Sequence, residues 1–308
     1  MDIRQLQYLS ALAQERHFTR AAQRCNVTQP TLSGRIRQLE QELGVPIVER
    51  DHRYHALTAE GERVLRWAET ILDNCDAMRQ ELSALKGGLS GRLALGVIPS
   101  ALPMVVAVSG AMRARYPSVA VSVHSRTSDK ILQEVEAFHF DAGITYLDNE
   151  PVERMETRHL YDEHYQLFLP ADHEWANRES VTWAEAAELP LCLLTPNMQN
   201  RRIINGAFHA AQCSPVAEIE TDSVVALWSH VRFGGWASIM PAYFSELFGN
   251  ESTVHSIPLV EPEVRHQVGL ITLARDPLSP IVAALFEVCR DTPLFPLAGD
   301  HLLPADSG

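Results

Sequence analysis

The sequence predicts an α/β protein with an amino-terminal winged helix-turn-helix, a long helix, and an α/β body of two lobes. Three observations support this fold class. A short helix and a capped, arginine-bearing helix occupy the first 44 residues, apolar residues keep heptad spacing across 58–86, and apolar strands alternate with helices from residue 92 onward. A chain of 308 residues is also longer than one hydrophobic core usually supports, so more than one domain is expected.

The composition predicts a soluble, cytoplasmic protein with reduced thiols. Hydrophobic residues make up 46% of the chain, but no apolar run reaches the roughly 20 residues of a membrane-spanning helix. The opening MDIRQLQYLS lacks the apolar stretch of a signal peptide. The five cysteines are widely spaced and form no C-x-x-C pair. We therefore expect neither a disulfide framework nor a structural metal site, and no resident cofactor.

The net charge of −13 is distributed unevenly. Residues 1–57 contain eight Arg against six Asp or Glu, and no acidic residue occurs between Arg16 and Leu39. The rest of the chain is therefore strongly acidic. A modestly basic amino-terminal part on an acidic body is the pattern of a localised contact with nucleic acid, and it argues against a protein that coats nucleic acid over its whole surface.

Residues 26–44 carry the clearest local signal, after two expected short helices. Thr28 can cap the next helix, Pro30 falls in its first turn, where the missing N–H costs nothing, and Gly44 ends it. Two helices joined by a tight turn form a helix-turn-helix. Apolar residues of the second helix recur every three or four positions at Leu32, Ile36, Leu39 and Leu43, and the first three are expected in the core.

The next segment, VPIVERDHRYHALT, predicts a small two-stranded wing, and Thr58 starts a long helix over 58–86. At 1.5 Å per residue this helix would extend roughly 40 Å, too long to be covered by a head of 57 residues. Its narrow apolar seam favours a partner helix and therefore a dimer, although a helix packed within its own monomer has the same pattern. The seam residues are Val64, Ala68, Ile71, Cys75, Met78, Leu82 and Leu85.

The stretch KGGLSG ends the long helix and predicts a hinge. Beyond it, apolar segments such as RLALGVI and LCLLT read as strands that alternate with helices, which indicates parallel α/β organisation. The acidic pair Asp162 and Glu163 reads as solvated surface. The expected divisions are a head (1–57), a linker helix (58–86), a hinge (87–91), a body (92–296, with lobe I about 92–160 and 268–296 and lobe II about 161–267), and a tail (297–308).

The order of these parts resembles one family. The motif FTRAAQRCNVTQPTLSGRIRQLEQELGVPIVER, then LTAEG, a long helix, and a body containing VRFGGWASIMP are similar to the LysR-type transcriptional regulators over essentially the whole chain. The resemblance implies a winged helix-turn-helix on promoter DNA, a dimerising linker helix, and a two-lobed effector-binding domain similar to periplasmic solute-binding proteins. It also implies a homotetramer built from dimers, contacts with RNA polymerase, and no membrane partner.

By this resemblance the start of the recognition helix faces base edges, while arginines along it face phosphate. Gln29 suits bidentate hydrogen bonding to adenine, and Pro30 with the Thr31 methyl can contact thymine. Arg37 could instead pair with acids on a solvated face. The family commonly has arginine at Gly34, which leaves the operator preference open. The expected DNA-binding residues are Thr28, Gln29, Pro30, Thr31, Ser33, Arg35, Arg37, Arg50 and Arg53.

An effector site is expected where hydroxyls and helix N-termini follow strands, because ligands of α/β sheets lie outside the carboxyl ends of the strands. Such groups suit a small anion such as a short carboxylate, although Ser and Thr there can serve only as helix caps. Trp236 stands where the family commonly has glycine, and it either narrows the cleft or packs in the lobe core. AGITYLDNEP resembles regulators beside formate dehydrogenase operons, which suggests formate. The expected effector-binding residues are Ser100, Thr127, Ser128, Thr195, Asn200, Arg201 and Trp236.

The sequence also bears on two other function classes, an enzyme and a thiol redox sensor. The chain lacks G-x-G-x-x-G, H-E-x-x-H and G-x-S-x-G motifs, so no enzyme and no catalytic residue is expected. The alternative within regulation is a thiol redox sensor of the peroxide-responsive LysR branch. Cys192 lies inside the strand LCLLT and Cys213 is 21 positions later, whereas the reactive pair of those sensors sits closer together and just past that strand. Buried structural thiols are therefore expected.

Overall fold

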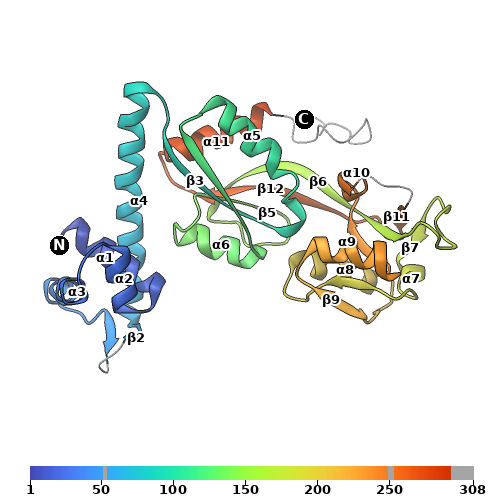
Figure 1. Ribbon diagram of the computed structural model, residues 1–308, viewed down its shortest axis with the longest axis horizontal. Coiled ribbons are helices and arrows are strands. Elements are labelled where there is room, and N and C mark those ends of the chain that lie inside the picture. The colour runs from blue at the N-terminus through green and yellow to red at the C-terminus, as the bar shows by residue number, and fades with distance from the viewer. Residues whose placement is uncertain (51–53, 249–252, 293–308) are drawn as a thin grey trace. The chain divides into compact units, whose positions relative to one another are not determined.

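The chain forms two compact units, Met1–Leu89 and Ser90–Gly308, in a computed structural model that describes residues 1–50, 54–248 and 253–292 (Figure 1). The division falls inside the segment 87–91 for which a hinge was expected. The expected tail, 297–308, lies outside the described residues. No helix in the described part of the chain is both long and apolar enough to cross a membrane.

The first unit is built on three short helices: α1 (Ile3–Glu15), α2 (Phe18–Arg24) and α3 (Gln29–Leu43). Thr28 caps α3, since its side chain accepts a hydrogen bond from the Thr31 N–H, and Gly44 ends the helix in the left-handed conformation with φ 71°. The apolar faces of the three helices meet in one core that includes Leu6, Leu9, Leu12, Ala21, Leu32, Ile36 and Leu39. The expected helix-turn-helix is thus present as α2 and α3.

The wing and the long helix complete this unit. Strand β1 (Val48–Arg50) pairs antiparallel with β2 (Tyr54–Leu57), and α4 (Ala59–Gly87) follows. Thr58 Oγ1 accepts a hydrogen bond of 2.8 Å from the Gly61 N–H. A Cβ at Gly61 would lie 2.1 Å from the carbonyl oxygen of Ile47, so only glycine lets the start of α4 pack this closely on the wing.

The apolar seam of α4 is divided between two environments. Val64, Ala68 and Ile71 pack against the core of their own unit. By contrast, Met78 is 56% exposed and Leu82 is 51% exposed. Cys75, which lies between Ile71 and Met78 along the seam, is half-buried, and the side chain of Leu85 lies outside those described. The first half of the seam therefore packs within its own monomer, while Met78 and Leu82 are left uncovered within one chain.

The buried residue Glu69 of α4 should make the stability of the first unit depend on pH. It is 8% exposed, and burial raises the pKa of its carboxyl from 4.5 to about 7, opposed by Arg66. The folded state holds the Glu69 proton more tightly than the unfolded chain. The contribution of protonated Glu69 to the free energy of unfolding is therefore complete below pH 4.5 and is lost as pH rises through about 7. We expect a loss of up to about 3 kcal/mol across this window. Hydrogen exchange of α1 and α4 amides at several pH values would measure it.

Glu69→Gln should remove most of this pH dependence, because the amide does not ionise. Glu62→Gln, at an exposed position of the same helix, is the matched control and should leave the dependence intact. An unchanged pH profile in the Glu69→Gln variant would show that another group causes it.

The second unit is built around a sheet of order β4-β3-β5-β12-β6-β11-β7, with β10 also paired to β6. Its first three strands are parallel, as expected, but β12 runs antiparallel to both β5 and β6. The sheet is therefore mixed rather than parallel, because the chain enters and leaves the second lobe along β6 and β12. The strands are β3 (Gly91–Val97), β4 (Val119–Ser125), β5 (Ala142–Tyr146), β6 (Met155–Pro170), β7 (Val181–Thr182), β10 (Ser238–Pro241), β11 (Val254–Val260) and β12 (Arg265–Leu273).

Helices cover the strands of each lobe (Figure 1). In lobe I, α5 and α11 pack together beside β3 and β4, and α6 packs over β3, β5 and β12. In lobe II, α8 and α9 contact β8, which pairs in parallel with β9. These elements are η1 (Pro99–Ala101), α5 (Val105–Arg115), α6 (Ser128–Glu136), α7 (Trp183–Ala186), β8 (Cys192–Leu194), α8 (Gln199–Ala210), β9 (Ile219–Thr221), α9 (Val224–Gly234), α10 (Phe244–Phe248) and α11 (Pro280–Asp291).

Candidate functional site

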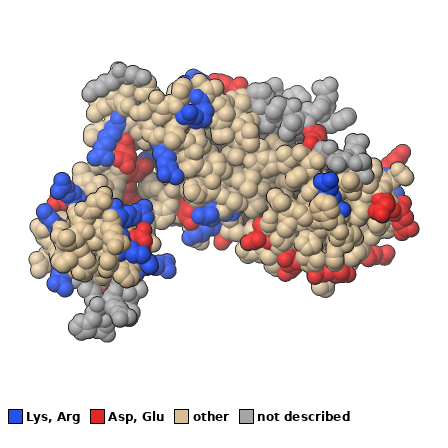
Figure 2. Space-filling model, viewed as in Figure 1, with Lys and Arg blue, Asp and Glu red and all other residues tan. Residues whose placement is uncertain are grey.

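The first candidate site is the outer surface of α3. Its first turn is exposed: Thr28, Gln29, Pro30 and Thr31 all face solvent, while Ser33 is half-buried. This is the geometry of a recognition helix, whose first turn reaches base edges in the major groove. Figure 2 shows Lys and Arg side chains on the visible face of this unit. It shows Asp and Glu side chains on the visible face of lobe II.

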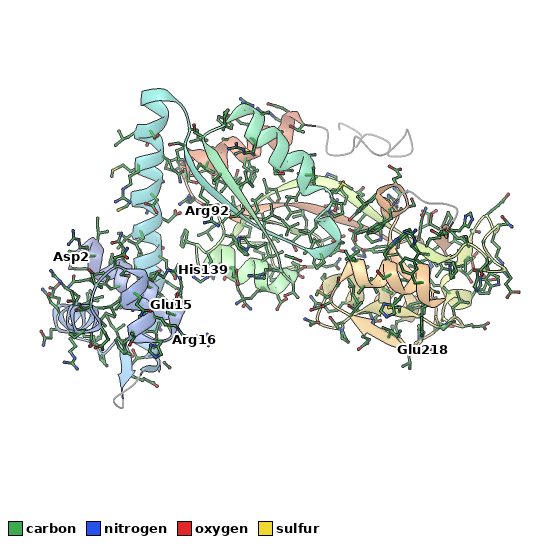
Figure 3. All side chains as sticks on the ribbon, in the orientation of Figure 1. Asp2, Glu15, Arg16, Arg92, His139 and Glu218 are labelled. Carbon is green, nitrogen blue, oxygen red and sulfur yellow. The ribbon has the colours of Figure 1, made fainter. Side chains whose placement is uncertain are left out.

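The two arginines of α3, Arg35 and Arg37, differ in their contacts with neighbouring side chains. Arg35 Nη1 lies 3.4 Å from Asp2 Oδ2 and 3.3 Å from Gln38 Oε1. Arg37 is exposed and makes no ion pair within the described residues, since the neighbouring Glu40 accepts hydrogen bonds from the Ile47 and Val48 N–H groups instead. Arg37 is therefore the more available of the two cations. Figure 3 labels Asp2 on this unit.

The wing is described only in part. Arg50 is the last residue of β1 and pairs with Tyr54 after a shift in register between Glu49 and Arg50, and its side chain is outside those described. Arg53 lies outside the described residues. The expected contacts of both with DNA stay predictions.

The second candidate site is a buried polar cluster, here called the Glu163 cluster, in the second unit. Glu163 is 1% exposed, and its Oε1 accepts hydrogen bonds from the hydroxyls of Tyr146 at 2.6 Å and Tyr165 at 2.7 Å. Asn200 Nδ2 lies 3.5 Å from the same oxygen, and Ser100 Oγ lies 3.3 Å from the Tyr146 hydroxyl. These side chains come from η1, β5, β6 and α8, so the cluster joins elements of both lobes.

The electrostatics of this cluster follow from burial. Burial raises the pKa of Glu163, and the hydrogen bonds from Tyr146 and Tyr165 oppose that shift. Burial likewise raises the pKa of the Tyr146 hydroxyl, with the Glu163 charge adding to the shift. Glu163 Oε2 is buried without a hydrogen-bond partner among the described residues. An anionic ligand beside this carboxyl would be repelled whenever Glu163 is ionised.

The expectation from sequence was wrong for Glu163, because the pair Asp162 and Glu163 was expected on solvated surface and Glu163 is buried. Only Asp162 is partly exposed, where it contacts His159 at 2.8 Å. Alternation along β6 was the available signal, since a period of two places Glu163 on the same side of the strand as Tyr161 and Tyr165. Tyr243 also joins the cluster, and its hydroxyl donates to the Ser100 carbonyl.

The expected effector residues are only partly brought together. Ser100 and Asn200 meet in the Glu163 cluster. The Thr195 hydroxyl is buried without a hydrogen-bond partner among the described residues. Thr127 is the N-cap residue of α6 and makes no side-chain cap bond. Ser128 is 1% exposed, and its hydroxyl is buried without a hydrogen-bond partner among the described residues.

Two expected residues point elsewhere. Arg201 is 6% exposed, and its guanidinium donates to the Leu194 carbonyl at 2.6 Å and to Glu220 at 2.9 Å. Its charge is therefore compensated inside lobe II. Trp236 Nε1 donates to Glu218 at 3.2 Å, and its ring contacts His230 edge-on (Glu218 is labelled in Figure 3). Neither side chain is part of the Glu163 cluster.

The thiols are all free, and burial raises their pKa wherever a shift is seen. Cys192 on β8 is fully buried with a pKa of about 11. Cys213, just beyond α8, is half-buried and its Sγ lies 3.2 Å from the Phe208 carbonyl oxygen. Raised pKa values keep these thiols protonated at neutral pH, which slows their reaction with oxidants.

Comparison with known proteins shows which family has this architecture. The family described as "Bacterial regulatory helix-turn-helix protein, lysR family" matches residues 3–62, and "LysR substrate binding domain" matches residues 86–293. The chain is a LysR-type transcriptional regulator. It is therefore a non-enzymatic, DNA-binding protein with a two-lobed effector-binding domain. The LysR assignment and the fold class expected from sequence are confirmed.

Several relatives are peroxide regulators. The chain is 32% identical over 291 residues to the "DNA-binding transcriptional dual regulator OxyR" of Escherichia coli, covering 94% of this chain and 95% of that one. It is 30% identical to the "Hydrogen peroxide-inducible genes activator" of Pectobacterium carotovorum, covering 94% and 96%. A full-length OxyR variant from Pseudomonas aeruginosa superposes with a TM-score of 0.76 at 26% identity, covering 96% and 99%. These similarities favour the redox alternative over the small-anion reading, and they give no support to formate.

Proposed function

We propose that this LysR-type regulator responds to peroxide and controls promoters that it binds through α3 and the wing. The observation that carries the proposal is the identity of 30–32% with peroxide regulators over most of both chains. We further propose that it acts in the cytoplasm as a dimer or dimer of dimers. Its contacts with RNA polymerase are proposed on family resemblance.

Arg37→Ala should weaken operator binding and flatten its salt dependence, because each phosphate contact contributes about 0.9 to the slope of log K against log salt. Arg35→Ala should have the same effect to a smaller extent, since Asp2 already competes for that guanidinium. Fluorescence anisotropy with operator DNA across a salt series measures both slopes. An unchanged slope in the Arg37 variant would remove this residue from the interface.

Oxidation of Cys213 is the proposed sensing step, because Cys213 is the more exposed of the two lobe II thiols. Its thiolate would attack one oxygen of H₂O₂, the O–O bond would break, and the departing hydroxide would take up a proton to give water and a sulfenic acid. Attack by the Cys192 thiolate on that sulfenic sulfur would then form a disulfide and release hydroxide, which takes up a proton from solvent to give a second water. The raised thiol pKa values predict that this reaction is slow.

Mass spectrometry after timed peroxide treatment, in parallel with operator binding, tests the step. We expect a Cys192–Cys213 bridge to form together with a change in DNA affinity, and Cys213→Ser to abolish both. Cys289→Ser, at a buried thiol of α11, is the control and should change neither. A peroxide response that persists in the Cys213→Ser variant would contradict the thiol mechanism.

A second candidate function is response to a small organic anion, as the sequence suggested. The observation that favours it is a groove beside α8 that Arg202 and Arg265 line, rather than the Glu163 cluster, whose carboxyl disfavours an anion. Operator binding measured with and without a carboxylate panel, in the absence of oxidant, separates the two functions.

A further inference from the structure

A groove runs along the outer face of α8 in the second unit. The cavity measures about 630 Å³, within the range typical of small-molecule sites. Its helical wall has the spacing of one helix face, with Gln199, Arg202, Ile203, Gly206, Ala207 and Ala210. The opposite wall is the segment 262–266, whose last two residues begin β12, and Asn149 also lines the groove.

One end of this groove is polar and carries charges of both signs, since Asp148 Oδ2 lies 3.0 Å from His266 Nδ1. Asn149 Nδ2 lies 2.6 Å from His266 Nδ1, and Arg202 Nε donates to Gln199 Oε1 at 2.5 Å. Glu150 partly compensates Arg202, at 3.4 Å. Arg265 is exposed and makes no ion pair within the described residues, so it offers an uncompensated guanidinium. A carboxylate fits this end because guanidinium groups bind it in bidentate fashion.

The remainder of the groove is apolar, except for one acid. Ile203, Gly206 and Ala207 on α8 face Pro262 and Val264, and this strip suits a hydrocarbon body. Glu263 also lines the groove, two positions before Arg265 and three before His266. A second carboxylate on the ligand would meet this acid. The groove therefore favours monocarboxylates over dicarboxylates.

His266 links the groove to the Glu163 cluster. Its ring centroid lies 6.4 Å from that of Tyr146 and 6.5 Å from that of Tyr165, in both cases edge-on. These two tyrosines hold the Glu163 carboxyl between the lobes. We propose that the α8 groove binds a monocarboxylate with an apolar body, whose contact with His266 acts on the cluster joining the lobes. The proposal supplies a site for the small-anion alternative and is independent of the peroxide response.

Filling the groove gives a clean test, because a Cβ added at Gly206 meets no atom within 4 Å. Leucine there should occupy the groove and also favour the helix, since glycine is the poorer helix former by about 1 kcal/mol. Calorimetric titration of the full-length protein with benzoate and with hexanoate should give binding that Gly206→Leu weakens at least tenfold. Gly206→Ala, which leaves the groove open, should retain binding. Gly110→Leu, at a helical glycine of α5 that is equally open, should also retain it.

Arg265→Gln tests the charge preference. It should reduce the preference for benzoate over benzyl alcohol about tenfold, and adipate should bind the unmodified protein more weakly than hexanoate. Absence of benzoate and hexanoate binding at about 1 mM in the unmodified protein, or equal binding in Gly206→Leu, would overturn the site. An unchanged benzoate preference in Arg265→Gln would overturn the ligand class. Operator binding and peroxide response, measured on the same variants, should persist, so that failure of the groove is distinguishable from failure of the regulator function.

Discussion

Replacing Met78 and Leu82 together by glutamate is expected to turn the protein into a monomer and to weaken operator binding at least about 100-fold. Both side chains lie on the second half of the α4 seam and are more than half exposed within one chain. A partner helix would cover them, and two carboxylates in such an interface would be desolvated without partners. Loss of the second recognition helix then removes the gain in affinity from binding two half-sites.

The control places the same charge elsewhere on α4. Ala77→Glu with Gln80→Glu adds two acids away from the seam and should leave both the oligomeric state and operator affinity nearly unchanged. Analytical ultracentrifugation at micromolar concentration and anisotropy with one-site and two-site DNA provide the measurements. A Met78 and Leu82 variant that stays dimeric would show that assembly depends on another surface.

Glu163→Ala is expected to cost about 3 kcal/mol of stability in the second unit. Truncation leaves the buried hydroxyls of Tyr146 and Tyr165 without their shared acceptor and opens a space at the point where the lobes meet. Glu163→Gln should cost less, because an amide oxygen can still accept both hydrogen bonds. Urea denaturation followed by tryptophan fluorescence measures the loss.

The neighbouring residue provides the control for Glu163. Asp162→Ala changes a partly exposed acid of the same strand and should alter stability by less than about 0.5 kcal/mol. Equal losses in the two alanine variants would mean that burial of the Glu163 carboxyl does not determine the stability of this region.

The amino-terminal unit was largely predictable because its signals are local. Thr28, Pro30 and Gly44 act within one helix, and heptad spacing on α4 is visible in any single sequence. What spacing could not determine was the partner of each seam residue. Ala68 and Leu82 occupy the same heptad position two repeats apart, yet Ala68 is fully buried in its own unit and Leu82 is 51% exposed, since the contacts of α4 with that core end at Leu72.

The Glu163 cluster was less predictable because it is assembled from distant segments. Ser100 and Asn200 were expected from their places after strands, and they do meet. Arg201 was expected to face a ligand, but Glu220, 19 positions away, holds it inside lobe II. Glu163 was missed because an acid beside another acid resembles surface until the pairing of β6 shows which side of the strand is covered.

The continuous strand β6 has a practical consequence for anyone who wishes to study one lobe in isolation. Its 16 residues pair with β12 along lobe I and with β10 and β11 along lobe II. A truncation between the lobes would cut this shared ladder and expose unpaired backbone on both fragments, which invites aggregation. Ligand-binding fragments of this protein should therefore be designed to begin near Ser90 and to retain the whole second unit.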